Sequence, residues 1–388
     1  MDISATSTAP PHGRNDPIDM LRGLSITLVV LFHIQLRMPF ETTFVGRVLP
    51  GAIFNPIFRS GYYAVIVFFV ISGFLITTSS LRRWGGLGGL RPGPFYLQRF
   101  ARIAPSLAVL MILLAALHWA GVEGFVVTTT SLGRAVLAAA TFHLNWLEAD
   151  TGYLPGAWDV LWSLSVEEVF YLAFPPIVLL ARGSRGFVAA MLVFVALGPF
   201  ARACFTDNDI WADKSYLAGA DAIALGCLAG LAAGTTRISR AMARTCLTCG
   251  LALFLFVFIG RRQTAALGLT ALGLNVTVLA GGVALMLVGL RDRTFPPGSF
   301  AVWSSAPIRW FGRNSYEVYL SHMVVITLLA PLFAGAVRSG TAPFWAVGLV
   351  LLSGLAGHGL ARGYSEPLNR AIRRRLAGPA RTGSETSL

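Results

Sequence analysis

The chain has 388 residues, of which 55% are hydrophobic and only 13% are charged, and its formal net charge is +13. A soluble domain carries about 25% charged residues, so this composition excludes a soluble globular protein and indicates a polytopic membrane protein. The basic excess is arginine apart from Lys214. We assign it to loop anchors that follow the positive-inside rule, and we expect no nucleic-acid partner.

Ten apolar segments are long enough to cross a bilayer, which needs about 20 residues each. The sequence therefore predicts an all-α, polytopic membrane helix bundle of about ten transmembrane helices. The expected spans are 22–40, 61–80, 103–120, 161–181, 187–204, 216–234, 246–260, 265–290, 316–336 and 342–361.

Arginine is concentrated on the loops of one side, the side that carries Arg22 and Arg99, which predicts that both termini are cytoplasmic. We expect a single transmembrane domain at 21–370. A polar cytoplasmic segment precedes it at 1–20, and a basic, disordered cytoplasmic tail follows at 371–388. Neither a cleaved signal peptide nor a fused soluble domain is expected.

The first span carries two ionisable side chains, Arg22 and His33. A rise of about 1.5 Å per residue separates them by roughly 16 Å along a helix, so His33 lies near mid-bilayer if Arg22 lies at one face. An ionisable group at that depth favours a functional role, here a neutral imidazole that takes a proton from an attacking hydroxyl. The alternative is a histidine that packs through a hydrogen bond to a neighbouring helix.

Two arginines precede the third span. Arg99 and Arg102 are three positions apart and share a helix face. Two guanidinium groups there make a good phosphate receptor, and Arg82, Arg83 and Arg91 strengthen the positive field. The alternative is ordinary anchoring at the cytoplasmic face.

The longest loop, 121–160, is expected on the outer side. Its apolar stretch 133–147 is too short to cross and is predicted to be re-entrant or interfacial. Its polar and aromatic side chains suit an external substrate, although the tryptophans also fit an interfacial belt. These side chains are His143, Asn145, Trp146, Glu148, Asp150, Trp158 and Asp159.

The block 162–171, Trp-Ser-Leu-Ser-Val-Glu-Glu-Val-Phe-Tyr, opens the fourth span. Ser163, Glu167 and Tyr171 share one helix face, whereas Glu168 points about 100° away from Glu167. We expect Glu167 to orient His33 or to hold an acceptor hydroxyl. The alternative is an interfacial charge pair near a helix N-terminus.

Later segments carry weaker signals. Asp221 is a lone acid within the sixth span, and Tyr316, Tyr319 and His322 form one broad face that can line a cavity or anchor the helix at an interface. The pair Cys246-x-x-Cys249 has neither a second cysteine pair nor a nearby histidine. No metal site is therefore predicted.

Four motifs in this order resemble the acyltransferase type 3 family of integral-membrane acyltransferases, which modify bacterial surface glycans and some macrolide antibiotics. The resemblance runs from about Pro17 to Arg370. The motifs are Arg-x10-His (Arg22, His33), Ser72-Gly73-Phe74, Arg-x-x-Arg (Arg99, Arg102) and the block 162–171.

The resemblance implies an acyl-CoA donor on the cytoplasmic side, most simply acetyl-CoA as a co-substrate, with no permanently bound cofactor. It implies that His33 is the catalytic base, supported by Arg22, and that Glu167 is an active-site carboxylate. Arg99 and Arg102 would contact the coenzyme A phosphates.

Two further positions depart from the family pattern. In the family, an arginine often precedes the aspartate that corresponds to Asp221. In this sequence Gly219 stands at the position of that arginine. His322 falls where the family often has a histidine followed by Trp or Pro, and Met323 follows it here.

The predicted function is acyl transfer to a hydroxyl of a carbohydrate, such as a cell-surface or exported polysaccharide, in the bacterial inner membrane. A macrolide or other small-molecule acceptor is the alternative within this class. A proton-coupled transporter or glycan-lipid flippase is a rival from another class, because ten spans with intramembrane His, Glu and Asp also suit transport. A sensory or scaffold protein that has lost catalysis is a further rival. The oligomeric state stays open.

Overall fold

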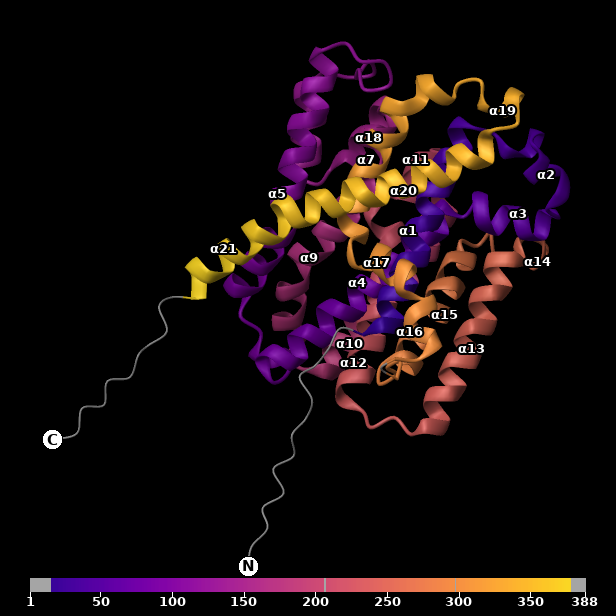
Figure 1. The fold of residues 1–388 in the computed structure, drawn as a ribbon. Helices are drawn as coiled ribbons and strands as arrows, with labels where there is room; N and C mark the ends of the chain where they lie inside the picture. The colour runs from indigo at the N-terminus through magenta and orange to yellow at the C-terminus, as the bar shows by residue number, and fades with distance from the viewer. Residues whose placement is uncertain (1–14, 206, 297, 378–388) are drawn as a thin grey trace, which may run out of the picture.

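The computed structural model describes residues 15–205, 207–296 and 298–377. Within these ranges the chain contains helices and no strand, and nine of the helices are long and apolar enough to cross a membrane. This confirms the predicted polytopic all-α bundle (Figure 1). The nine spans are built on α1 (Asp16–Arg37), α4 (Gly61–Trp84), α5 (Pro92–Trp119), α9 (Trp162–Ala181), α10 (Ser184–Cys204), α12 (Tyr216–Thr235), α13 (Arg240–Ile259), α18 (Ser315–Phe333) and α20 (Ala342–Leu360).

The predicted span 265–290 is corrected by the structure. It is divided between α14 (Arg261–Ala266) and α15 (Leu274–Leu290), which has 17 residues. The chain turns between them because Gly268 and Gly273 take φ values of 73° and 65°, which favour glycine. At about 1.5 Å per residue α15 rises about 25 Å, slightly less than a hydrocarbon core.

Helix α1 begins six residues before the predicted start of the first span. The Asn15 side chain caps it by accepting from the Ile18 amide at 3.1 Å. Asp16 then forms an ion pair with Arg309 of α17 (Ala306–Arg313) at 2.6 Å. The predicted polar segment 1–20 is therefore helical from Asp16 onward, and residues 1–14 lie outside the described residues.

The end of the described chain is also more ordered than predicted. A π-helical turn, η3 (Ala361–Ser365), links α20 to α21 (Glu366–Ala377). In Figure 1 these last helices, in yellow, run obliquely across the bundle. Residues 371–377 belong to α21, which corrects the predicted disordered tail for those positions, and 378–388 lie outside the described part.

Close backbone approaches hold the central helices together. A Cβ on Gly73 of α4 would lie 1.9 Å from the Ile223 carbonyl oxygen, and one on Gly226 of α12 would lie 2.0 Å from that of Val70. Glycine is needed at both positions because two helix backbones touch there, as small residues allow in membrane bundles. This contact fixes the rotation of α4, which carries Ser72 next to Gly73.

The loop 121–160 contains only short helices. The stretch 133–147 falls in α6 (Leu132–Ala140) and α7 (Leu144–Thr151), and neither is long enough to cross. Helix α8 (Gly156–Asp159) follows and packs against α18, while α7 packs against α9. The other short helices are η1 (Phe40–Thr42), α2 (Phe44–Val48), α3 (Gly51–Phe58), η2 (Leu87–Gly89), α11 (Asp209–Lys214), α16 (Phe300–Ser304) and α19 (Ala336–Ser339).

Candidate active site

A cavity of about 530 Å³ lies between α1, α4, α5, α9 and α18. Most of the residues that the sequence singled out line it, although they come from four helices far apart in the chain. They are Arg22, Arg99, Arg102, Ser163, Glu167, Glu168, Tyr171, Tyr316 and Tyr319. Three other predicted site residues, His33, His322 and Asp221, are not among its lining residues.

One end of the cavity is strongly basic. Arg82, Arg83, Arg99 and Arg102 all line it, and none of them forms an ion pair with a carboxylate in the described ranges. Arg22 lies there too and donates to the Ser315 hydroxyl from Nη2 at 2.8 Å and from Nε at 3.1 Å. We name this arginine group the basic end; its concentrated positive charge suits a ligand with several phosphates.

Glu167 is held in the middle of the cavity by neighbours other than those predicted. The hydroxyls of Ser72 and Tyr171 both donate to its Oε1. The Arg99 guanidinium lies 4.4 Å from the centre of the Tyr171 ring, a cation–π contact. The prediction that Glu167 orients His33 is wrong in this geometry, because the hydrogen bonds of Glu167 go to Ser72 and Tyr171.

Glu168, the second carboxylate of the block 162–171, has an oxygen atom without a hydrogen-bond partner among the described residues. Its side chain is buried against the cavity, and the atom is Oε1. Buried polar atoms normally have a partner. Glu168 therefore offers an unsatisfied carboxyl to a bound molecule.

The end of the cavity opposite the arginines is formed by Ser163 and Tyr319. The Tyr319 hydroxyl lies 2.7 Å from the Ser163 hydroxyl and donates to the Val160 carbonyl at 2.8 Å. Tyr316, one turn earlier on α18, donates to the Ile103 carbonyl at 3.0 Å. The predicted polar face of α18 therefore lines the cavity with its two tyrosines, whereas His322 lies beyond them.

His322 contacts His33, a pairing that the sequence did not predict. The His322 Nε2 lies 3.3 Å from the His33 Nδ1, and the ring centres are 5.0 Å apart. The Nδ1–H of His322 donates to the Tyr319 carbonyl at 2.7 Å, and that of His33 to the Val29 carbonyl at 2.8 Å. With both rings neutral, these bonds leave the lone pair of His33 on Nε2.

Asp221 has a structural partner that the sequence did not reveal. Arg202 of α10 donates to both carboxylate oxygens, at 2.6 and 3.1 Å, and the Thr277 hydroxyl donates to Oδ2 at 2.6 Å. A Cβ on Gly219 would lie 2.8 Å from Phe69 and Val166 side-chain atoms, which leaves no room there for an arginine. The buried pair ties α10, α12 and α15 together and corrects the interpretation of Asp221 as a lone acid.

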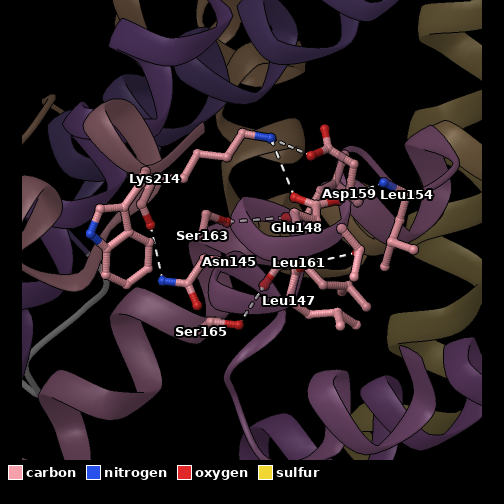
Figure 2. A network of polar contacts seen from close by, with 12 residues as sticks. Asn145, Leu147, Glu148, Leu154, Asp159, Leu161, Ser163, Ser165 and Lys214 are labelled. Atoms are coloured by element: carbon pink, nitrogen blue, oxygen red, sulfur yellow. Dashed lines mark hydrogen bonds and ion pairs between the residues drawn. The ribbon is translucent and has the colours of Figure 1, made fainter. Parts of the chain in front are cut away.

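A second polar network lies near the start of α9 (Figure 2). Lys214 forms an ion pair with Asp159 and lies 3.6 Å from Glu148 Oε2. Asn145 donates to the Lys214 carbonyl at 3.0 Å. Two acids therefore share one lysine, and burial, followed by the charge of Asp159, raises the pKa of Glu148.

Glu148→Gln is expected to flatten the pH dependence of stability. A carboxyl with a raised pKa in the folded state disfavours folding once ionised, so the free energy of unfolding falls as pH rises above its ordinary value of 4.5. The slope for one proton is at most about 1.4 kcal/mol per pH unit. Thermal unfolding between about pH 5 and pH 8 measures it, with the exposed Asp150→Asn as control. Equal slopes in Glu148→Gln and wild type would contradict a buried, protonated Glu148.

Several residues of the cavity and its surroundings were missed from sequence. Ser72 was noted only as part of a motif, and Ser80, Arg202 and Lys214 received no role. Ser72, Ser79 and Ser80 lie on one side of an otherwise apolar span, a helical periodicity that could have identified them. Arg202 carried no such signal because its partner lies on another helix.

Sequence comparison relates this chain to known acyltransferases. The profile of an acyltransferase domain, acyltransferase 3, matches residues 15–360. The peptidoglycan O-acetyltransferase OatA of Listeria monocytogenes is 24% identical over 346 residues, which cover 81% of this chain and 50% of that protein. Bacillus subtilis YrhL, provisionally named a peptidoglycan O-acetyltransferase, is 24% identical over 371 residues, covering 88% of this chain and 52% of YrhL.

A third similarity covers less of the molecule. A Staphylococcus aureus protein, provisionally named an O-acetyltransferase, is 26% identical over 169 residues, 41% of this chain and 24% of its own length. The chain spans about half the length of OatA and YrhL. No solved structure matches it significantly. Since the acyltransferase profile covers nearly all of the described bundle, the chain belongs to the acyltransferase 3 family of multi-pass membrane proteins.

Proposed function

We propose that the protein is a membrane O-acyltransferase that moves an acyl group, acetyl in the first instance, from acyl-CoA to a hydroxyl of a carbohydrate. Family membership supports acyl transfer, and relatives named for peptidoglycan O-acetylation support a cell-surface or exported polysaccharide as acceptor. The observation that supports acyl-CoA as the donor is the cavity, which is lined by the arginines of the basic end and by the carboxyl groups of Glu167 and Glu168.

The residues that line the cavity suit an acyl-CoA molecule. The phosphates of acyl-CoA would lie against Arg99 and Arg102, and the pantetheine arm would run along Ser72 and Glu167. The unsatisfied Oε1 of Glu168 would pair with one of its polar groups. The thioester would then reach Ser163 and Tyr319.

His33 would act as the base beyond that point. Its Nε2 takes the proton of the acceptor hydroxyl, the oxygen attacks the thioester carbonyl, and the C–S bond breaks. The imidazolium returns the proton to the departing thiolate, so the products are an ester and free CoA. The Tyr319 ring lines the cavity and lies 5.6 Å from the His322 ring, so it connects the cavity to the histidine pair.

The proposed orientation follows from the donor. Acyl-CoA is a cytoplasmic molecule, so the basic end would face the cytoplasm of a bacterial inner membrane, with both termini on that side. The loop 121–160 would then lie outside, where the acceptor approaches. The predominance of arginine at the basic end agrees with the positive-inside rule.

Proteoliposomes test the function directly. Purified protein would receive labelled acetyl-CoA on the side of the basic end and a soluble peptidoglycan or polysaccharide fragment on the other. Label recovered in an alkali-labile ester of the acceptor supports the proposal. Movement of the acceptor across the membrane without ester formation would favour a transporter and overturn it.

Arg102→Ala is expected to raise the KM for acetyl-CoA by about ten- to a hundredfold with little change in kcat, because a lost charge-assisted contact to phosphate weakens binding by roughly 1.5–3 kcal/mol. The same assay in detergent measures it. Arg134→Ala is the matched control, since Arg134 is exposed and pairs with Asp150 away from the cavity. An unchanged KM in Arg102→Ala would contradict phosphate binding at the basic end.

A further inference from the structure

The cavity is also lined by aromatic and polar side chains to which the proposed mechanism gives no role. Trp84 ends helix α4 and lines the cavity with Arg83 and Gln98. The Arg83 guanidinium lies 5.8 Å from the centre of the Trp84 ring and donates to the Gln98 side-chain oxygen at 3.1 Å. An indole face, a planar cation and an amide therefore meet at one place beside the basic end.

Ser80 adds a second, independent observation. It lies four residues before Trp84, so both side chains occupy the same face of α4. Ser80 is only 1% exposed and lines the cavity, yet its hydroxyl has no hydrogen-bond partner among the described residues. A buried hydroxyl without a partner points to a polar group of a bound molecule.

Open space lies beside the backbone that directly follows Trp84. Gly85 and Gly86 take φ values of 69° and 148°, and no atom lies within 4 Å of a Cβ built on either. The chain then folds back so closely that a Cβ on Gly89 would lie 2.4 Å from the Trp84 carbonyl oxygen. The glycines therefore fix the end of α4 and leave open space beside the chain that follows Trp84.

We propose that Trp84, Arg83, Gln98 and Ser80 form a nucleobase subsite that binds the adenine ring of the CoA donor. A flat heteroaromatic base stacks on an indole or a guanidinium, and an amide and a hydroxyl satisfy its edge. The subsite shares Arg83 with the basic end, so adenine there would lie beside the phosphates, as it does in CoA. The inference rests on the proposed function and deepens it, because the subsite selects a nucleotide thioester over an acylated carrier without a base.

A lipid-facing anchor is the competing role for this tryptophan, since indoles gather at membrane interfaces. An anchor would affect the whole protein and would not distinguish one donor from another. A nucleobase subsite would affect only donors that carry adenine. The two roles are separated by measuring donors with and without adenine on proteins with and without the Trp84 side chain, as in a double-mutant cycle.

The experiment compares kcat/KM of the full-length protein for acetyl-CoA, acetyl-3′-dephospho-CoA and acetyl-phosphopantetheine, the last of which lacks adenosine. In Trp84→Ala we expect kcat/KM to fall about tenfold for the two adenine-containing donors, through KM, as expected for one lost stacking contact. It should stay unchanged for acetyl-phosphopantetheine. Trp84→Phe, which keeps an aromatic face, should recover most of the loss.

Trp303→Ala is the matched control, because Trp303 is exposed and does not line the cavity. An equal fall for all three donors in Trp84→Ala would assign Trp84 to anchoring or folding and overturn the subsite. An unchanged value for all three would overturn it as well. Failure of the wild-type protein to use acetyl-CoA would instead contradict the proposed function.

Discussion

Replacement of His33 by alanine is expected to lower acyl transfer by about a hundred- to ten-thousand-fold, the range in which a positioned general base contributes. The reason is the fixed geometry of the imidazole. Its Nδ1 is engaged by the Val29 carbonyl and by Nε2 of His322, so Nε2 of His33 is the nitrogen left to accept a proton. Steady-state transfer of label from acetyl-CoA to the acceptor measures the loss.

Two variants of His322 sharpen this prediction. His322→Leu removes the group that faces His33 Nδ1, so kcat should fall by about tenfold or more while the KM for acetyl-CoA is unchanged, since His322 does not line the cavity. His322→Gln keeps an acceptor near the position of Nε2 and should recover part of kcat. A purely structural role would give both variants the same kcat.

The control for His33→Ala is its unfolding temperature, because a protein that fails to fold also fails to react. The imidazole is half-buried, and we expect the His33→Ala protein to fold. Wild-type acyl transfer by a His33→Ala protein that unfolds at the wild-type temperature would exclude His33 as the base.

Asp221→Ala is expected to have the largest effect on stability, about 3–5 kcal/mol, because it leaves the buried Arg202 guanidinium without its counter-charge. The side chains of the pair are only 5% and 0% exposed. Three helices meet there, since Arg202 also donates to the Gly273 carbonyl at 2.9 Å and Asp221 accepts from Thr277. Thermal unfolding in detergent measures the loss.

The double variant Arg202→Met, Asp221→Leu is the informative control. It removes both charges and replaces them with apolar side chains, so it should be markedly more stable than Asp221→Ala. The catalytic parameters of the double variant should stay near the wild type, because neither residue lines the cavity. A double variant no more stable than Asp221→Ala would show that the charge pair is not the source of the stability.

The candidate site was predictable from sequence to the extent that its signals were local. Arg99 and Arg102 share a helix face because of their spacing, and both line the cavity. Ser163, Glu167 and Tyr171 follow the same rule on α9 and also line it. The helical period of 3.6 residues is fixed by the backbone, so it needs no knowledge of the neighbours.

The pairings across helices were not predictable in this way. Glu167 bonds to Ser72, 95 positions away, and His33 meets His322, 289 positions away. Each pairing depends on how two helices are rotated against each other, and close contacts such as that between Gly73 and the Ile223 carbonyl set this rotation. A one-residue change of register would turn a side chain by about 100° and remove the contact.

The sequence by itself therefore determined the membrane class, the helical bundle and the charged residues and tyrosines that line its cavity, because hydropathy and helical spacing are properties of neighbouring residues. Only the tertiary structure decided that Asp221 serves a buried ion pair, that Glu167 lies apart from His33, and that His322 holds His33. These contacts arise from packing between helices that are distant in the chain. The same packing decides whether a buried charge is paired, and pairing offsets the free-energy cost of its burial.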